Sequence, residues 1–213
     1  MHIETELKFP VDSFEAVTRI LRQATGDNTP WYFEKNIVLD DEQGTLKKRD
    51  SLLRLRTGLG NKLTFKLPVK GEEQGQAKSR QEYETGIENI QEMESVFRHL
   101  GLKTWLSYEK YRQVWKLDEA KICLDVLPFG RFVEIEGNQE NINKTALMLG
   151  LDPDVATNKT YHELNQIFSA KHGHEQGNDF VFTPDQREVL DRELNIGKEK
   201  GDYEEADLNV FDK

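Results

Sequence analysis

Residues 2–9 read HIETELKF and alternate ionisable side chains with mostly apolar ones. This period of two is typical of a β-strand, whose successive side chains point to opposite faces of a sheet. Glu4, Glu6 and Lys8 therefore share one face of the strand, and Leu7 and Phe9 share the other. Most sheets of soluble proteins bury the apolar face and leave the charged face in water.

The same alternation recurs in five later segments, LLRLRT, KLTFKL, RQEYET, EKYRQVW and FVEIEG. Amphipathic helices predicted within 11–26 and 89–101 offer a cover for the apolar faces from outside. We therefore expect the charged faces to line the inside of a strongly curved or closed sheet, as polar residues line a water-filled barrel. The charged residues on these five faces are Arg54, Arg56, Lys62, Lys66, Arg80, Glu82, Glu84, Lys110, Arg112, Glu134 and Glu136.

Two further strands, near 31–39 and 120–127, bring the number of strands to about eight, and the second of them carries Asp125. Turn-like segments between neighbouring strands favour an antiparallel meander. Short helices are also expected around 139–149 and 159–169. The predicted fold class is α+β, an eight-stranded antiparallel β barrel with a charged lumen and helices packed outside.

The length of 213 residues allows one substantial core, which we place in residues 1–169. Residues 170–213 read as an acidic linker, a helix that begins after Thr183, and a tail. The apolar runs are too short to span a bilayer, and the single cysteine, Cys123, agrees with a reducing compartment, so we expect a cytoplasmic protein without a membrane partner. The net charge of −10 argues against nucleic-acid binding, and a homodimer is possible.

Confined charges are tolerated only when they pair with one another or with a bound molecule. Pairs on an exposed face of an open sheet would be the simpler explanation, and each such pair contributes roughly 0–1 kcal/mol. Paired carboxylates, however, also offer hard oxygen ligands to Mg²⁺ or Mn²⁺. Arginine and lysine form charge-assisted hydrogen bonds with phosphate oxygens. Carboxylate pairs together with several cations favour a polyphosphate ligand.

The ordered segments ETELK, RLR, LTFK, RQEYE, EKYR, LD, FGRFVEIEG and KTYHEL resemble the CYTH domain. This is the triphosphate tunnel metalloenzyme superfamily, which includes class IV adenylate cyclases, thiamine triphosphatases and inorganic triphosphatases. The resemblance covers about residues 1–168 and implies an eight-stranded antiparallel tunnel with helices outside. It also implies a divalent metal, Mg²⁺ or Mn²⁺, and a small-molecule triphosphate substrate.

Carried over residue by residue, the resemblance assigns metal binding to Glu4, Glu6, Glu134 and Glu136. Triphosphate binding falls to Lys8, Arg54, Arg56, Lys66, Arg80, Lys110, Arg112 and Lys159. Lys159 would cap one end of the tunnel, although a solvated helix lysine explains it equally well. Catalytic roles are assigned to Lys8, Arg56, Glu84 and Asp125. The acidic residues Glu82, Glu84 and Asp125 would bind a second metal, orient the cations or position the nucleophile.

Three functions follow from these residues. The leading hypothesis is a class IV adenylate cyclase-like enzyme that converts ATP to cyclic AMP and pyrophosphate. The alternative enzyme is a triphosphatase that hydrolyses inorganic or thiamine triphosphate. A protein of another class, a polyphosphate-binding module without turnover, is also compatible with the sequence. Aromatic residues such as Trp31, Tyr32 and Trp105 either stack on a substrate ring or pack under the helices.

Overall fold

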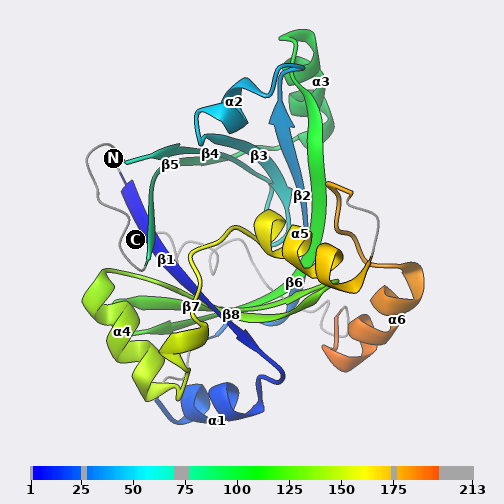
Figure 1. Ribbon diagram of the computed structural model, residues 1–213. Helices are drawn as coiled ribbons and strands as arrows, with labels where there is room; N and C mark the ends of the chain where they lie inside the picture. The colour runs from blue at the N-terminus through cyan, green and yellow to red at the C-terminus, as the bar shows by residue number, and fades with distance from the viewer. Residues whose placement is uncertain (1, 25–27, 70–76, 174–176, 197–213) are drawn as a thin grey trace.

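The computed structural model describes residues 2–24, 28–69, 77–173 and 177–196. Its centre is a closed barrel of eight antiparallel strands (Figure 1). Around the barrel the order is β1-β5-β4-β3-β2-β6-β7-β8. The strands are β1 (His2–Val11), β2 (Tyr32–Asp40), β3 (Leu52–Thr57), β4 (Lys62–Pro68), β5 (Lys78–Gly86), β6 (Lys103–Leu117), β7 (Ala120–Leu127) and β8 (Gly130–Glu136). The predicted barrel is thereby confirmed.

Strand β1 closes the barrel, because it pairs with β5 along its first half and with β8 along its second half. In this register Glu4 lies opposite Arg80, and Lys8 lies opposite Glu134. Directly opposed residues of an antiparallel pair share a face of the sheet. The charged residues of β1, β5 and β8 therefore lie on one common face.

Helices cover the other face of the sheet, as predicted. They are α1 (Glu15–Ala24), α2 (Thr45–Lys48), α3 (Ile90–His99), α4 (Gln139–Met148), the 3-10 helix η1 (Pro153–Val155), α5 (Tyr161–His172) and α6 (Pro184–Glu193). Helix α4 packs on β1, β7 and β8, α1 contacts β6, and α3 covers β3, so these helices lie outside the barrel (Figure 1). None of the described helices combines the length and apolarity needed to cross a bilayer.

The main hydrophobic core lies between the barrel wall and these helices, not inside the barrel. Leu7, Ile122 and Ile135 point outward from β1, β7 and β8 and are almost completely buried. They pack against Leu21 of α1 and Ile142 of α4 in the same cluster. Burying apolar area of this kind contributes about 25 cal/mol per Å². The apolar outer face is thus the one that holds the fold together.

The chain after the gap at 174–176 packs against β6. Phe180 forms a parallel bridge beside Tyr108, and its backbone N–H donates to the Ser107 carbonyl at 3.2 Å. Helix α6 begins after Thr183, whose hydroxyl accepts from the backbone N–H of Gln186, as the sequence predicts for an N-cap. Residues 177–196 therefore contact the barrel directly, and residues 197–213, where the acidic tail is expected, lie outside the described part. The division at residue 169 stays a prediction.

The position of the core leads to a matched pair of variants on α4. Ile142 is fully buried, and Leu147 on the same helix is 70% exposed. We expect Ile142→Ala to lower the free energy of unfolding by about 2–5 kcal/mol, because a core cavity is left behind. Leu147→Ala should change it by less than about 0.5 kcal/mol. Urea denaturation followed by circular dichroism measures both, and equal losses would contradict this description of the core.

Candidate active site

The inner face of the barrel brings the predicted charged residues together around one cavity of about 1140 Å³. Strand register explains this, since Lys66 lies opposite Glu82 and Arg112 lies opposite Asp125. Of the residues assigned from sequence, Asp125 is buried behind the lining and Lys159 is not part of it. The lining includes Glu4, Glu6, Lys8, Arg54, Arg56, Lys66, Arg80, Glu82, Glu84, Lys110, Arg112, Glu134 and Glu136.

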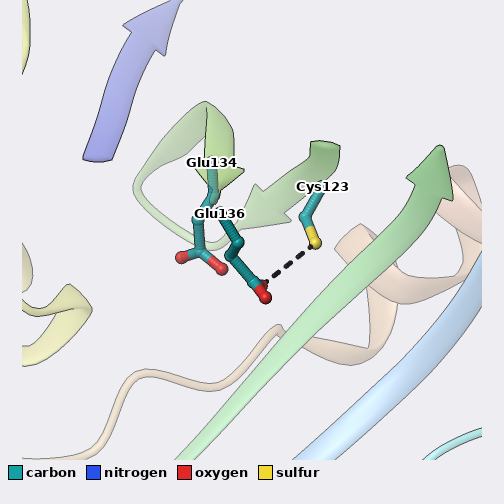
Figure 2. A group of neighbouring side chains, drawn as sticks. All are labelled: Cys123, Glu134 and Glu136. Carbon is teal, nitrogen blue, oxygen red and sulfur yellow. Dashed lines mark hydrogen bonds between the residues drawn. The ribbon is translucent and has the colours of Figure 1, made fainter. Parts of the chain in front are cut away.

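Two carboxylates of the predicted metal site project from β8, as Figure 2 shows, and Cys123 lies next to them on β7. Ligand atoms of Glu134, Glu136 and Cys123 all lie within 4.8 Å of one another. Burial raises the pKa of the Cys123 thiol well above its usual value, so the sulfur keeps its proton. The thiol donates to Glu136 Oε1 at 3.6 Å. Cys123 therefore holds Glu136 in place, and the hard oxygen donors are the carboxylates.

The other two predicted metal carboxylates lie on β1. Glu6 opposes Glu136 across the β1–β8 pair, and Lys8 lies between Glu6 and Glu134, with its Nζ 3.3 Å from Glu134 Oε2. Glu4 accepts from Lys66, which also pairs with Glu82 at 3.0 Å. Lysine residues thus bridge carboxylates that would otherwise repel one another.

The chemistry of this donor set fits a hard divalent cation. Burial, opposed by Lys66 and reinforced by Glu6 and Glu82, raises the pKa of Glu4 above its ordinary value. A carboxylate in such a position gains from a nearby positive charge. Oxygen donors from two adjacent strands match the preference of Mg²⁺ and Mn²⁺ for carboxylates shared with water and phosphate. Glu4, Glu6, Glu134 and Glu136 are therefore suitable residues to hold such an ion.

Asp125 is the buried centre of a cation cluster on the neighbouring wall. Its two oxygens accept from Arg112 Nε at 2.6 Å and Arg112 Nη2 at 2.5 Å. Lys110 Nζ lies 3.2 Å from the same carboxylate, and the Tyr161 hydroxyl donates to it at 2.7 Å. Arg112 also reaches Glu134 at 2.8 Å, so the cation cluster contacts the predicted metal site. With all these partners, Asp125 is placed to orient cations.

Glu34 of β2 belongs to the site but was not predicted from sequence. Its side chain is 2% exposed, and it lies 3.5 Å from Lys110 and 3.7 Å from Arg56. Burial alone would raise the pKa of Glu34, but Lys110, Arg112 and Arg56 lower it to about 2. The polar side chains of Tyr32, Glu34 and Asn36 alternate, and this alternation could have placed Glu34 on the inner face. The sequence did not decide this, because Lys35 places a second charge next to Glu34 on the opposite face.

Arg54 and Arg56 lie side by side on β3 but differ in their partners. Arg56 Nη2 pairs with Glu84 at 3.1 Å, and Glu84 also pairs with Lys62 at 2.8 Å. Burial opposes ionisation of Glu84, but Arg56 and the hydrogen bond from Lys62 lower its pKa to about 2. Arg54 forms no ion pair within the described ranges, and it donates to the Tyr108 hydroxyl at 3.1 Å. Arg54 therefore has charge to offer to a bound anion.

Two of the predicted phosphate ligands lie at the periphery. Arg80 lines the cavity at its rim, where it pairs with Asp50 at 2.6 Å. Lys159 is exposed and lies outside the lining, just before the Thr160 cap of α5. Tyr161, two residues further along the chain, lines the cavity instead, with its ring 5.2 Å from Lys8 Nζ and 5.4 Å from Lys110 Nζ. Other lining cations that sequence reasoning did not assign are Lys78, Lys116 and Lys121.

The comparison with protein families gives one match, which covers all eight strands of the barrel. The model of the CYTH domain matches residues 2–149. A protein of Methanocaldococcus jannaschii named "Putative adenylate cyclase MJ0240" is 28% identical over 144 residues, which is 67% of this chain and 81% of that protein.

Solved structures show the same fold. A Vibrio parahaemolyticus protein described as a "putative adenylate cyclase" aligns with a TM-score of 0.66 and 20% identity, over 77% of this chain and 98% of that one. A Hippeastrum protein described as a "putative adenylyl cyclase" that reveals a dominant triphosphatase activity aligns with a TM-score of 0.53 and 17% identity, over 84% of this chain and 99% of that one. Because the CYTH domain model matches well over half of the residues, the chain belongs to the CYTH domain family.

Proposed function

We propose that this protein is a divalent-metal-dependent enzyme that acts on a triphosphate inside the barrel. The observation that carries the proposal is the two-sided lining of the cavity. Four carboxylates of β1 and β8 lie on one side, and arginine and lysine side chains of β3, β4 and β6 extend around the rest. Carboxylates of this kind suit Mg²⁺ or Mn²⁺, and the cations suit phosphate oxygens.

The residues of the chain divide the work of phosphoryl transfer between them. Glu4, Glu6, Glu134 and Glu136 would hold the Mg²⁺ or Mn²⁺ ion, which supplies Lewis-acid stabilisation of phosphate charge when bound. Arginine and lysine side chains, led by Arg54, which forms no ion pair with another described residue, would neutralise the remaining charge of the transition state.

The other members of the site would keep these groups in position. Lys8 lies at the border between carboxylates and cations, where it can reach a phosphate oxygen and still balance Glu134. Asp125 fixes Arg112 and Lys110, and Glu84 fixes Arg56. We propose a positioning role for both acids, because their oxygens are already engaged by cations.

The leading reaction is that of a class IV adenylate cyclase. The ribose 3′ hydroxyl of ATP would attack the α phosphorus, and pyrophosphate would leave. The name of the Methanocaldococcus jannaschii relative, 28% identical over 144 residues, supports this reaction. Hydrolysis at the terminal phosphorus of inorganic or thiamine triphosphate is the second candidate, and the triphosphatase activity described for the Hippeastrum protein supports it.

One set of assays distinguishes these functions. The purified protein is incubated with ATP, inorganic triphosphate or thiamine triphosphate in Mg²⁺ or Mn²⁺, and cyclic AMP, pyrophosphate and orthophosphate are quantified. Cyclic AMP with equimolar pyrophosphate supports the cyclase, and orthophosphate supports the triphosphatase. Anion binding without any product would contradict both and favour the non-catalytic module.

The metal assignment predicts a loss of turnover in carboxylate variants. We expect Glu4→Gln or Glu6→Gln to lower kcat at least about a hundredfold, because an amide is a much weaker metal ligand than a carboxylate. The exposed Glu140 on α4 provides a control, and Glu140→Gln should keep full activity. Circular dichroism should show an unchanged fold. Undiminished turnover in both site variants would exclude this metal site.

Substitutions of the two arginines of β3 should differ in their effects on ligand binding and on thermal stability. Arg54→Gln should raise the Kd for inorganic triphosphate at least about tenfold with little change in Tm, because the side chain leaves no carboxylate unpaired. Arg56→Gln should weaken binding and also lower Tm by several degrees, because Glu34 and Glu84 each lose one of their two cationic partners. Calorimetric titration and thermal unfolding measure both quantities, with the exposed Arg49→Gln as a control. Equal effects on Tm would contradict the pairing described above.

A further inference from the structure

Four buried polar atoms on the inner face of β2 and β3 have no hydrogen-bond partner among the residues that the structure describes. They are Asn36 Oδ1, Asn36 Nδ2, Glu34 Oε2 and Arg54 Nε. A fifth atom of this kind, His162 Nε2, lies on α5. Buried polar groups without partners cost free energy of folding, and native proteins rarely keep them without a use. Four of them on two neighbouring strands therefore point to a function.

Asn36 is the central member of this group. Its side chain is completely buried, and neither end of its amide has a partner within the described ranges. Asn36 lies opposite Tyr108 of β6, and Glu34 lies two residues away on the same face of β2. Arg54 lies opposite Val38, which makes it the diagonal neighbour of Asn36 on β3. Long side chains can span such a diagonal separation.

Arg54 is held in the structure by neutral partners only. Its Nη1 donates to the Tyr108 hydroxyl at 3.1 Å, and its Nη2 reaches Thr64 Oγ1 of β4 at 3.4 Å. Strand β2 lies between β3 and β6, so the contact with Tyr108 crosses the inner face of β2. A phosphate forms stronger, charge-assisted hydrogen bonds with both Nη atoms of a guanidinium than hydroxyl groups do. Arg54 is therefore able to turn from these hydroxyls to a phosphate in the cavity.

The four atoms on β2 and β3 are complementary in pairs. Arg54 Nε is a donor and Asn36 Oδ1 an acceptor, and Asn36 Nδ2 is a donor and Glu34 Oε2 an acceptor. Two hydrogen bonds, one from Arg54 to Asn36 and one from Asn36 to Glu34, would satisfy all four. Burial opposes the charge of Arg54, but Tyr108 and Glu34 raise the pKa of its guanidinium, which places Glu34 within electrostatic range. The ion pair with Lys110, at 3.5 Å, keeps Glu34 Oε2 beside this wall.

We propose that Asn36 is a positioning residue that sets the orientation in which Arg54 binds a phosphate. When both Nη atoms of Arg54 turn to two phosphate oxygens, its Nε donates to Asn36 Oδ1, and Asn36 Nδ2 donates to Glu34 Oε2. We name these three side chains the Arg54 relay. The inference rests on the proposed function, since it needs a phosphate ligand in the barrel. It gives the uncharged Asn36 opposite effects, a cost in stability and a gain in phosphate binding.

The first test replaces the amide by an apolar side chain of similar size in the full-length protein. Asn36→Leu should raise the Kd of inorganic triphosphate at least about fivefold, because Arg54 loses the acceptor for its Nε. The Tm without ligand should not fall, because the amide has no partner within the described ranges to lose. Calorimetric titration in EDTA, which prevents metal-dependent turnover, and thermal unfolding measure both quantities. An unchanged Kd, or a Tm lowered by several degrees, would overturn the proposal.

Gln113 on β6 provides a matched control, because it is a buried amide whose partners lie inside the protein. Its Nε2 donates to the Thr29 carbonyl at 3.1 Å, and its Oε1 accepts from Trp115 Nε1 at 3.0 Å. Gln113→Leu should therefore lower Tm by several degrees and leave the Kd of inorganic triphosphate unchanged. The same response from Gln113→Leu and Asn36→Leu would contradict a specific role of Asn36 in binding.

The second test is a double-mutant cycle, which separates positioning of Arg54 from a general effect on the barrel. In an Arg54→Gln background, Asn36→Leu should change the Kd of inorganic triphosphate less than about twofold, because no guanidinium is left to orient. In an Arg56→Gln background the loss should stay at least about fivefold, because Arg56 is not part of the Arg54 relay. Equal losses in both backgrounds would overturn the proposal. If Asn36→Leu does not fold, Asn36→Ala removes the same amide without added bulk, and the same cycle decides.

Failure of this inference differs from failure of the proposed function. A loss of binding in Asn36→Leu that depends on Arg54, without turnover by the unaltered protein in Mg²⁺ or Mn²⁺, would support the Arg54 relay and reject the enzyme. Turnover by the unaltered protein together with unchanged binding in Asn36→Leu would support the enzyme and reject the relay. No binding of inorganic triphosphate by the unaltered protein would reject both.

Discussion

Mutual neutralisation of charges is the interaction on which the lumen of this barrel depends. An unpaired buried ion costs several kcal/mol, so each cation of the lumen needs a carboxylate, a hydroxyl or a ligand beside it. Arg112 meets Asp125 and Glu134, and Lys66 meets Glu4 and Glu82. Register is therefore strongly specified. A slip of one residue in any strand would turn its charges into the apolar layer under the helices.

If the proposed function is correct, the same pairing would make the site selective for highly charged ligands. A triphosphate or a metal ion must compete with internal partners that are already in place. A metal ion held by the four proposed carboxylates would displace Lys8 from both of its partners and leave Lys66 with Glu82 only, whereas phosphates bound together with the ion would provide oxygen atoms for both lysines. Occupation by both should consequently be more favourable than occupation by either one.

Much of the architecture could be predicted from the sequence because charged and apolar side chains alternate with a period of two in six of the strands. That pattern located the lumen and most of the charged residues around it. It was not sufficient at β2, where Glu34 and Lys35 place adjacent charges on opposite faces and only the pairing with β3 and β6 decides between them. The short helix α2 was also missed, because its first turn is held by the buried carboxylate of Asp40, which accepts from Leu46 and Lys47 at 2.9 Å.

Tyr161 and Phe180, which line the cavity from the C-terminal part of the chain, could not be predicted from sequence for a different reason. Lys159 and Tyr161 are two residues apart, and the cap at Thr160 directs the second of them into the lumen while the first stays exposed. Phe180 reaches the cavity through a bridge to β6, a contact that spans more than seventy residues of sequence. Neither local periodicity nor composition carries information on such contacts.

The closing pair of strands has a consequence for the order of folding. Glu6 on the first strand faces Glu136 on the last, so the carboxylate cluster spans the joint between β1 and β8. During synthesis, β1 emerges about 120 residues before its second neighbour exists. Contacts so distant in sequence are entropically costly and form slowly. The corner that carries the proposed metal site should thus be the last to assemble, and until then β1 has an exposed edge that chaperones or neighbouring chains can bind.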